Sequence, residues 1–287
     1  MAAEARKRKR AGFLLAAFLL ATGAGFTAVK ARTDAVVRQK IPGSSIIYVP
    51  SGKFLKYATL GYNSLAADLV YIWSIQFYGD TRIADRFDYL DHIYGIIAEL
   101  DPRYIDPYEI GALIAVHEAR DVSLGYRILD RGMEKNPDNW VIPLLAGHLA
   151  QMTVRDFETA RRYFAAAMDL PGAPDFVRRL HANAIFRLSD YRTAWETWLD
   201  IYRTAEEDRV RRIATNHLYQ VKAAIDTEAL KKVIAAYRES RGRLPASLEA
   251  LVSAGLIREV PMDFDGNPYL YDPSTGDVKA AASPWKR

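Results

Sequence analysis

Four side chains near the C-terminus carry the oxygen atoms that hard metal ions prefer. Asp263, Asp265, Asn267 and Asp277 lie within one short segment, and carboxylate and amide oxygens of this kind bind calcium in proteins. The spacing differs from that of an EF-hand loop, because Gly266 stands at the fourth place rather than the sixth. The same residue types also form turns without any metal. The segment therefore has two interpretations, a weak calcium site and a set of turns.

The rest of the chain lacks the residue patterns of common catalytic sites. It contains no glycine-rich phosphate loop, no nucleophile elbow and no zinc signature. His117 and Glu118 resemble the start of a metalloprotease motif, but the second histidine four residues on is missing. The histidines fall at about the spacing of the repeat described below, which is typical of packing residues; they are His92, His117, His148, His181 and His217. We predict no catalytic residues and expect that the protein is not an enzyme.

The composition is that of an ordinary folded protein. Half of the 287 residues are hydrophobic and 26% are charged. Lysine and arginine exceed aspartate and glutamate by four, and much of this excess lies in the run RKRKR at residues 6–10. The rest of the chain is close to neutral, so we expect no nucleic-acid-binding face. The absence of cysteine excludes disulfides, thiolate metal sites and a lipoprotein cysteine.

The basic run precedes an uncharged apolar stretch, residues 11–29. Roughly 20 apolar residues span the hydrocarbon core of a bilayer, so we predict a transmembrane anchor here. Basic residues stay on the cytoplasmic side, which makes residues 1–10 a cytoplasmic tail. The predicted anchor side chains are Phe13, Leu14, Leu15, Phe18, Leu19 and Leu20. The alternative is a cleaved signal peptide, whose apolar core is shorter.

Residues 30–59 are predicted to form a linker with some extended structure. Turn signals occur at 42–45 and 50–52, and the β-prone run IIYV lies between them at 46–49. This segment separates the anchor from the periodic part of the chain.

Small and large residues then recur with a period of about 35 residues. One segment has the order Gly125, Leu129, Gly132 and Pro137. The corresponding sets are Leu90, Tyr94, Ile97 and Pro102; Ala160, Phe164, Ala167 and Pro171; and Ala194, Trp198 and Ile201. The pattern predicts helical hairpins. The small residues of each second helix let the first helix approach closely, the large residue fills the space between hairpins, and the proline ends the helix.

An aspartate stands before three of these second helices, at Asp121, Asp156 and Asp190. Aspartate is a favoured N-cap, because its carboxylate accepts a hydrogen bond from a free N–H of the first helical turn. We therefore predict that each of the three starts its second helix.

The repeat resembles that of the tetratricopeptide repeat (TPR) family, whose period is 34 residues. The resemblance covers residues 71–206. The first helices depart from it, since Gly111 to Gly125 is two residues longer than the family pattern and Gly147 to Ala160 one longer. The resemblance implies an α-solenoid of about four hairpins over residues 60–225. Stacked hairpins of this kind form a groove that binds peptides or partner helices.

The resemblance also points to contact residues in that groove. TPR proteins that clamp chaperone C-termini carry basic and asparagine side chains on successive first helices. Arg179 and Asn183 match such positions, and we add Phe186 as a third partner-binding residue. The corresponding places in an earlier unit hold Ile110 and Ile114. A carboxylate clamp is thus incomplete, and a mixed apolar groove is expected.

Residues 226–287 follow a different pattern. A helix ends near Tyr237, a Gly-x-x-Pro break and a second helix follow, and a GNPY sequence begins at Gly266. This order resembles the C-terminal half of the type II secretion major pseudopilins, and it implies a small α+β module. The distal end of that family binds calcium. Phe264 and Asp265 stand where the family has proline and tryptophan.

Two further phrases, LDPRY at 100–104 and LAADL at 65–69, resemble a group of membrane-anchored repeat proteins of bacteria. Together the resemblances imply a mainly α protein of the bacterial inner membrane, with one span, its N-terminus in the cytoplasm and its bulk in the periplasm. We expect a scaffold or adaptor that binds protein subunits of an envelope assembly, of pilus or secretion type, without nucleic acid. Calcium is the only cofactor that the residues suggest. A constitutive structural subunit of a membrane complex and a calcium-dependent secreted periplasmic factor stay open as alternatives.

Overall fold

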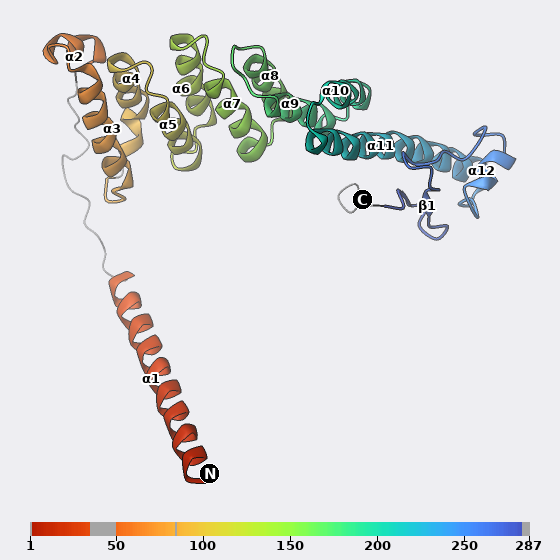
Figure 1. The fold of residues 1–287 in the computed structure, drawn as a ribbon, viewed down its shortest axis with the longest axis horizontal. Helices are drawn as coiled ribbons and strands as arrows, with labels where there is room; N and C mark the ends of the chain where they lie inside the picture. The colour runs from red at the N-terminus through yellow and green to blue at the C-terminus, as the bar shows by residue number, and fades with distance from the viewer. Residues whose placement is uncertain (1, 35–49, 84, 283–287) are drawn as a thin grey trace. The chain divides into compact units, whose positions relative to one another are not determined.

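Helices make up most of the chain (Figure 1). The computed structural model describes residues 2–34, 50–83 and 85–282. The helices are α1 (Ala2–Asp34), α2 (Gly52–Ala58), α3 (Asn63–Gly79), the 3-10 helix η1 (Arg86–Tyr89), α4 (Leu90–Leu100), α5 (Asp106–His117), α6 (Val122–Lys135), α7 (Val141–His148), the π-helix η2 (Leu149–Val154), α8 (Phe157–Met168), α9 (Phe176–Arg187), α10 (Tyr191–Thr204), α11 (Asp208–Arg241) and α12 (Glu249–Ser253). Strand β1 (Leu270–Tyr271) pairs antiparallel with β2 (Val278–Lys279). The prediction of a mainly α fold is confirmed.

The chain divides into two compact units. One comprises Met1–Val49 and Ile72–Tyr89, and the other Pro50–Tyr71 and Leu90–Arg287. In the first unit, the rings of Tyr78 and Phe87 stack with centroids 6.1 Å apart. The Arg86 guanidinium lies over Phe87 and donates to the backbone carbonyl of Tyr78 at 3.0 Å. These contacts hold the end of α3 to η1.

The predicted anchor falls within α1. Its side chains Leu15, Phe18, Leu19 and Leu20 are between 60% and 75% exposed. The side chains of Phe13 and Leu14 lie outside the described residues, as does the predicted β-prone run at 46–49. Among the described residues, no helix combines the length and the hydropathy that crossing a membrane requires.

In the second unit, helices α4 to α10 follow one another as neighbours (Figure 1). Helix α4 packs on α2, and the pairs α5–α6, α7–α8 and α9–α10 each form a hairpin. A Cβ on Gly125 of α6 would lie 2.6 Å from Val116 Cγ2 of α5, and one on Gly132 would lie 2.9 Å from the Tyr108 ring. The predicted close approach between the two helices of a hairpin is thus confirmed for α5–α6.

The large residue of each repeat fills the space where a hairpin meets the next element. Trp198 is 1% exposed and packs with Ile185 of its own first helix and with Leu218 of α11. Phe164 is fully buried and contacts both Val177 of α9 and the Gly147 backbone of α7. The predicted role of the large residues is therefore confirmed for these two.

The turns inside the hairpins share one geometry. The carboxylates of Asp121, Asp156 and Asp190 accept from backbone N–H groups at 2.8, 3.0 and 3.2 Å, which confirms all three predicted N-caps. The residue before each cap is left-handed, with φ of 60° at Arg120, 62° at Arg155 and 61° at Ser189. A left-handed residue ends the first helix and turns the chain back toward the second.

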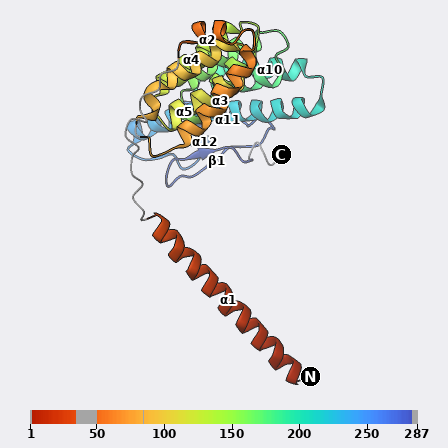
Figure 2. The same ribbon diagram turned by 90° about the vertical axis from the view of Figure 1, so that its left-hand side faces the viewer.

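Helix α11 continues across the predicted boundary at residue 226. Its first half packs on α10, as Figures 1 and 2 show, and its contacts include strand β2. Gly242, with φ of 71°, ends the helix at the predicted break. The Tyr269 hydroxyl donates to Asp226 at 2.7 Å, and the Tyr271 hydroxyl donates to the Pro245 carbonyl at 2.9 Å. The buried Tyr269 therefore ties the C-terminal residues to α11, and the half-buried Tyr271 ties them to the segment that follows the helix.

Replacing Gly147 by alanine tests the close packing of α7 on α8. The added Cβ would lie 2.5 Å from the Phe164 ring, which is fully buried and has no room to shift. We expect Gly147→Ala to lower the free energy of unfolding by about 1–3 kcal/mol, although alanine favours helix by about 1 kcal/mol. The matched control is Gly95→Ala in α4, where the nearest atom is an Arg131 nitrogen at 3.5 Å. It should stabilise the protein, and equal effects of the two changes in urea unfolding would contradict the packing role.

A second prediction concerns His217, whose ring stacks on Trp198 with centroids 3.9 Å apart. Burial lowers the pKa of His217 to about 4, although its contact with Gln220 opposes the shift. The unfolded chain, with a histidine pKa near 6.5, binds a proton that the folded chain excludes. Stability is therefore lost as the pH falls from about 6.5 to 4, by up to about 3 kcal/mol. His217→Phe keeps a stacked ring and should remove this part of the pH dependence in urea titrations. Parallel pH profiles would sink the prediction.

Candidate protein-binding surface

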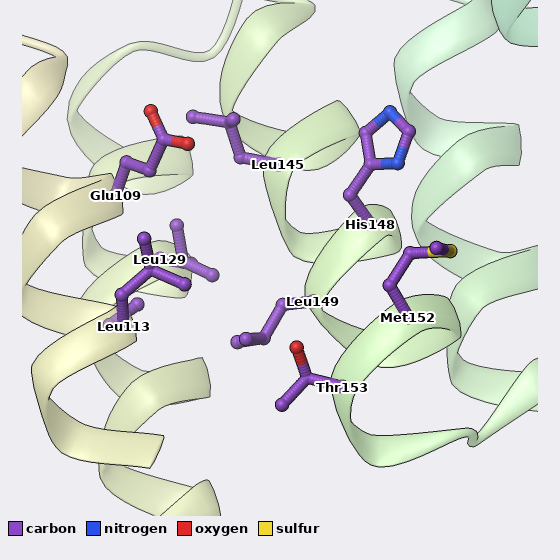
Figure 3. A pocket seen from close by; sticks show the side chains of 9 residues that line it. Glu109, Leu113, Leu129, Leu145, His148, Leu149, Met152 and Thr153 are labelled. Carbon is purple, nitrogen blue, oxygen red and sulfur yellow. The ribbon is translucent and has the colours of Figure 1, made fainter. Parts of the chain in front are cut away.

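A hollow of about 200 Å³ lies between the first helices of two successive hairpins. Figure 3 shows Leu113 and Leu129 on one side and Leu145 and Leu149 on the other, with Met152 at the edge. Helices α5, α6 and α7 and the π-helix η2 supply these residues. A cavity of about 150 Å³ holds a benzene molecule. The hollow therefore has room for one bulky apolar side chain.

The π-helix η2 shapes one wall of this hollow. From Gly147 to Ala160 the chain is one residue longer than from Ala182 to Ala194 in the next hairpin. The structure has its only described π-turn within the longer segment, as expected where one residue is inserted in a helix. The turn brings Met152, 70% exposed, and Thr153 to the edge of the hollow.

Two polar groups face each other across the opening. Glu109 of α5 and His148 of α7 both line the hollow (Figure 3). Burial lowers the pKa of His148, and the charge of Glu109 partly offsets this shift. The His148 ring also meets Phe164 edge-on, with centroids 5.6 Å apart. Burial therefore favours the neutral form of His148.

The predicted contact residues lie on α9, in the next hairpin. Arg179, Asn183 and Phe186 are all half-buried and follow one another at helical spacing along one side of the helix. Phe186 packs against Tyr191, with ring centroids 5.6 Å apart. Among the described residues, the side chains of Arg179 and Asn183 form no hydrogen bond or ion pair. None of the three lines the hollow between α5 and α7.

A second, larger hollow of about 730 Å³ was not predicted from the sequence. It lies where α10 and α11 meet the C-terminal residues, with Trp195, Ile225 and Phe264 as its apolar part. Trp195 and Phe264 meet edge-on at 6.1 Å. The pair is distant in sequence and joins two segments that we had assigned to separate domains, so no local pattern could reveal it.

The four calcium candidates do not form one cluster of free ligands. One Asp263 oxygen accepts from the backbone N–H groups of Asp265 and Asn267 at 3.0 and 2.8 Å. The other accepts from the buried Tyr219 hydroxyl at 2.9 Å. Asp277 forms an ion pair with Lys231 at 3.0 Å. Within the described residues, no group of three histidine or acidic side chains is placed to hold a metal ion.

The hydrogen bonds to Asp263 also affect the pKa of its carboxyl group. Burial acts to raise the pKa of Asp263, but the donors from Asn267, Tyr219 and Asp265 outweigh burial and hold the pKa below its usual value. Asp263 is 4% exposed. Its charged carboxylate therefore closes the turn and ties it to α11.

Comparison of the chain with known proteins finds no relative. No family model matches the chain, and neither a curated protein nor a solved structure gives a significant match.

The two interpretations of Asp263 predict different responses to calcium. If the carboxylate acts through its hydrogen bonds, Asp263→Asn lowers the free energy of unfolding by about 1–3 kcal/mol, equally in calcium and in EGTA. This equal loss is the result we expect. The matched variant is Asp265→Asn, because Asp265 is exposed and its removal should cost little in either buffer. Stabilisation of the wild type by calcium that both variants abolish would instead establish the metal site.

Proposed function

We propose that this protein is a membrane-anchored scaffold whose TPR-like hairpins bind a segment of a partner protein. The observation that carries the proposal is the repetition of one hairpin design. Three successive hairpins share an aspartate cap, a left-handed residue before it and a buried large residue on the second helix. Arrays of such hairpins present a continuous surface, and binding extended peptides or helices is its common use.

The surface of the first helices supports this role. It offers an apolar hollow of about 200 Å³ with Glu109 at its opening, and on α9 it offers Arg179 and Asn183. Protein-binding surfaces combine an apolar pocket for an anchor side chain with polar groups around it. The partner segment that fits has a bulky apolar residue for the hollow and polar groups for α9.

Anchoring in the membrane is supported by the N-terminal segment. The basic run at 6–10 precedes an uncharged stretch at 11–29, and the described apolar side chains of α1 are largely exposed. An exposed apolar helix behind a basic run is stable in a bilayer with its N-terminus in the cytoplasm. The scaffold would then serve an envelope assembly, and the pseudopilin-like order of the C-terminal residues favours one of pilus or secretion type.

The proposal is tested by purifying the full chain from membranes in mild detergent and identifying the co-purifying proteins by mass spectrometry. We expect the double variant Arg179→Glu, Asn183→Ala, and separately Met152→Lys, to lose the same partner by at least tenfold, because anchor contacts are worth 1–2 kcal/mol or more. The matched control is Arg203→Glu, which makes the same charge change at an exposed position of the second helix α10.

The outcomes separate the competing roles. A partner that all variants retain, but that Phe264→Ala loses, would place the contact at the larger hollow. A stoichiometric partner that withstands every change would favour a constitutive structural subunit. No partner at all would contradict the scaffold.

A further inference from the structure

A series of large apolar side chains is exposed on α2, on the start of α3 and on the turn between them. The exposed fractions are 72% for Phe54, 83% for Tyr57, 87% for Leu60, 71% for Tyr62, 56% for Leu65 and 61% for Leu69. We call these six residues the α2–α3 apolar surface. Scattered exposed leucines are normal, but a concentration of this kind marks an interaction site.

Leu60, in the turn between the two helices, is exposed and has a strained backbone conformation. Leu60 has a φ of 50° and is followed by Gly61 with a φ of 96°. A left-handed conformation is unfavourable for leucine, and glycine or asparagine would adopt it at lower cost. With 87% of its side chain exposed, Leu60 gains little from packing within the chain. A strained, exposed leucine therefore points to a contact outside the chain.

The charges beside this surface are mainly positive. Lys53 and Lys56 lie on α2, close enough to Glu99 to help lower its pKa, although the hydrogen bond from Lys135 is the main cause. Glu99 is already paired with Lys135 at 2.7 Å, so three lysines share one carboxylate. Asp68 on α3 lies toward Tyr104 and raises the pKa of that phenol, although burial has the larger effect. The apolar surface thus has a net positive border on its α2 side.

This combination of residues favours a lipid surface over a protein. Tyrosine and lysine together are typical of the membrane interface, where tyrosine rings lie at headgroup level and lysines reach the phosphates. Lysine is depleted in protein interfaces, and a second copy would bring like charges together. We propose that the α2–α3 apolar surface lies on an anionic bilayer, with Lys53 and Lys56 on the lipid phosphates.

The position in the chain makes this contact feasible. Between the end of α1 at Asp34 and the start of α2 at Gly52 the chain has about 17 residues, which extend to at most about 60 Å. The inference rests on the proposed anchoring of α1, which keeps the surface within reach of the bilayer. It adds a second contact that fixes which end of the second unit meets the membrane.

The absence of cysteine allows single-cysteine labelling of the full chain. An environment-sensitive fluorophore is placed at Tyr57→Cys, in vesicles of phosphatidylethanolamine and phosphatidylglycerol with or without brominated acyl chains. Reference positions are Leu20→Cys in the predicted anchor and Arg203→Cys on α10. We expect the brominated lipid to quench the probe at residues 57 and 20 and not at 203.

Variants then test what holds the surface to the lipid. Adding Leu65→Glu and Leu69→Glu should shift the equilibrium away from the bilayer by about tenfold or more per leucine. Both leucines are exposed, and circular dichroism checks that the variant folds. Replacing Lys53 and Lys56 by glutamine should weaken the contact by about fivefold per lysine, on anionic vesicles and not on neutral phosphatidylcholine.

The results distinguish failure of this inference from failure of the anchor. Quenching at residue 20 without quenching at 57 overturns the lipid contact and leaves the anchor intact. No quenching at residue 20 overturns the anchor. A probe at residue 57 that shifts with protein density, but is not quenched by brominated lipid, assigns the surface to a second copy and overturns the proposal.

Discussion

The distance between the two helices of each hairpin is the constraint on which the second unit depends. Gly125, Gly132 and Gly147 place backbone against the side chains of the facing helix, at distances where even a methyl group would not fit. The alanines at Ala160 and Ala194 are fully buried and act in the same way. Close backbone approach leaves a defined space at the junction with the next element, and Phe164 and Trp198 fill it. A larger residue at a small position would therefore disturb two interfaces at once.

Polar contacts between successive hairpins concentrate on the second helices. Arg131 and Lys135 of α6 pair with Asp91 and Glu99 of α4, and the Tyr163 hydroxyl of α8 donates to Asp130 of α6. Each exposed pair contributes little by itself, typically 0.2–1 kcal/mol. Their arrangement matters more than their strength. These contacts join the second helix α6 to α4 and the second helix α8 to α6.

The hairpins could be predicted because their determinants are local and repeated. An aspartate cap, a small residue and a large residue at fixed offsets need no knowledge of the rest of the chain. The left-handed residues escaped prediction because Arg120, Arg155 and Ser189 are not the glycine or asparagine that usually mark such positions.

The two hollows lay beyond prediction for another reason. One depends on a π-turn that absorbs an inserted residue, and the other on a contact between Trp195 and Phe264. The spacing between repeats shows that one residue is inserted. It does not show where the helix accommodates this residue or which side chains the insertion moves. We predicted a domain boundary at residue 226 because the residue pattern changes there. Helix α11 nevertheless continues through this position. A change in side-chain pattern does not require a break in the helix.

Repetition also separates structural irregularities from functional ones. A left-handed residue occurs at the same place in three hairpins, so the hairpin itself requires it. The π-turn of η2 and the left-handed Leu60 have no counterpart among the other described repeats. The π-turn is not needed to form a hairpin, since α9–α10 forms one without it. Both irregularities adjoin exposed apolar side chains, Met152 at the hollow and Leu60 itself on α2–α3. A strained conformation that the fold does not need persists where a contact outside the chain offsets its cost. This is the physical basis for proposing a protein partner at the hollow beside the π-turn. It is likewise the basis for proposing a lipid contact at the α2–α3 apolar surface.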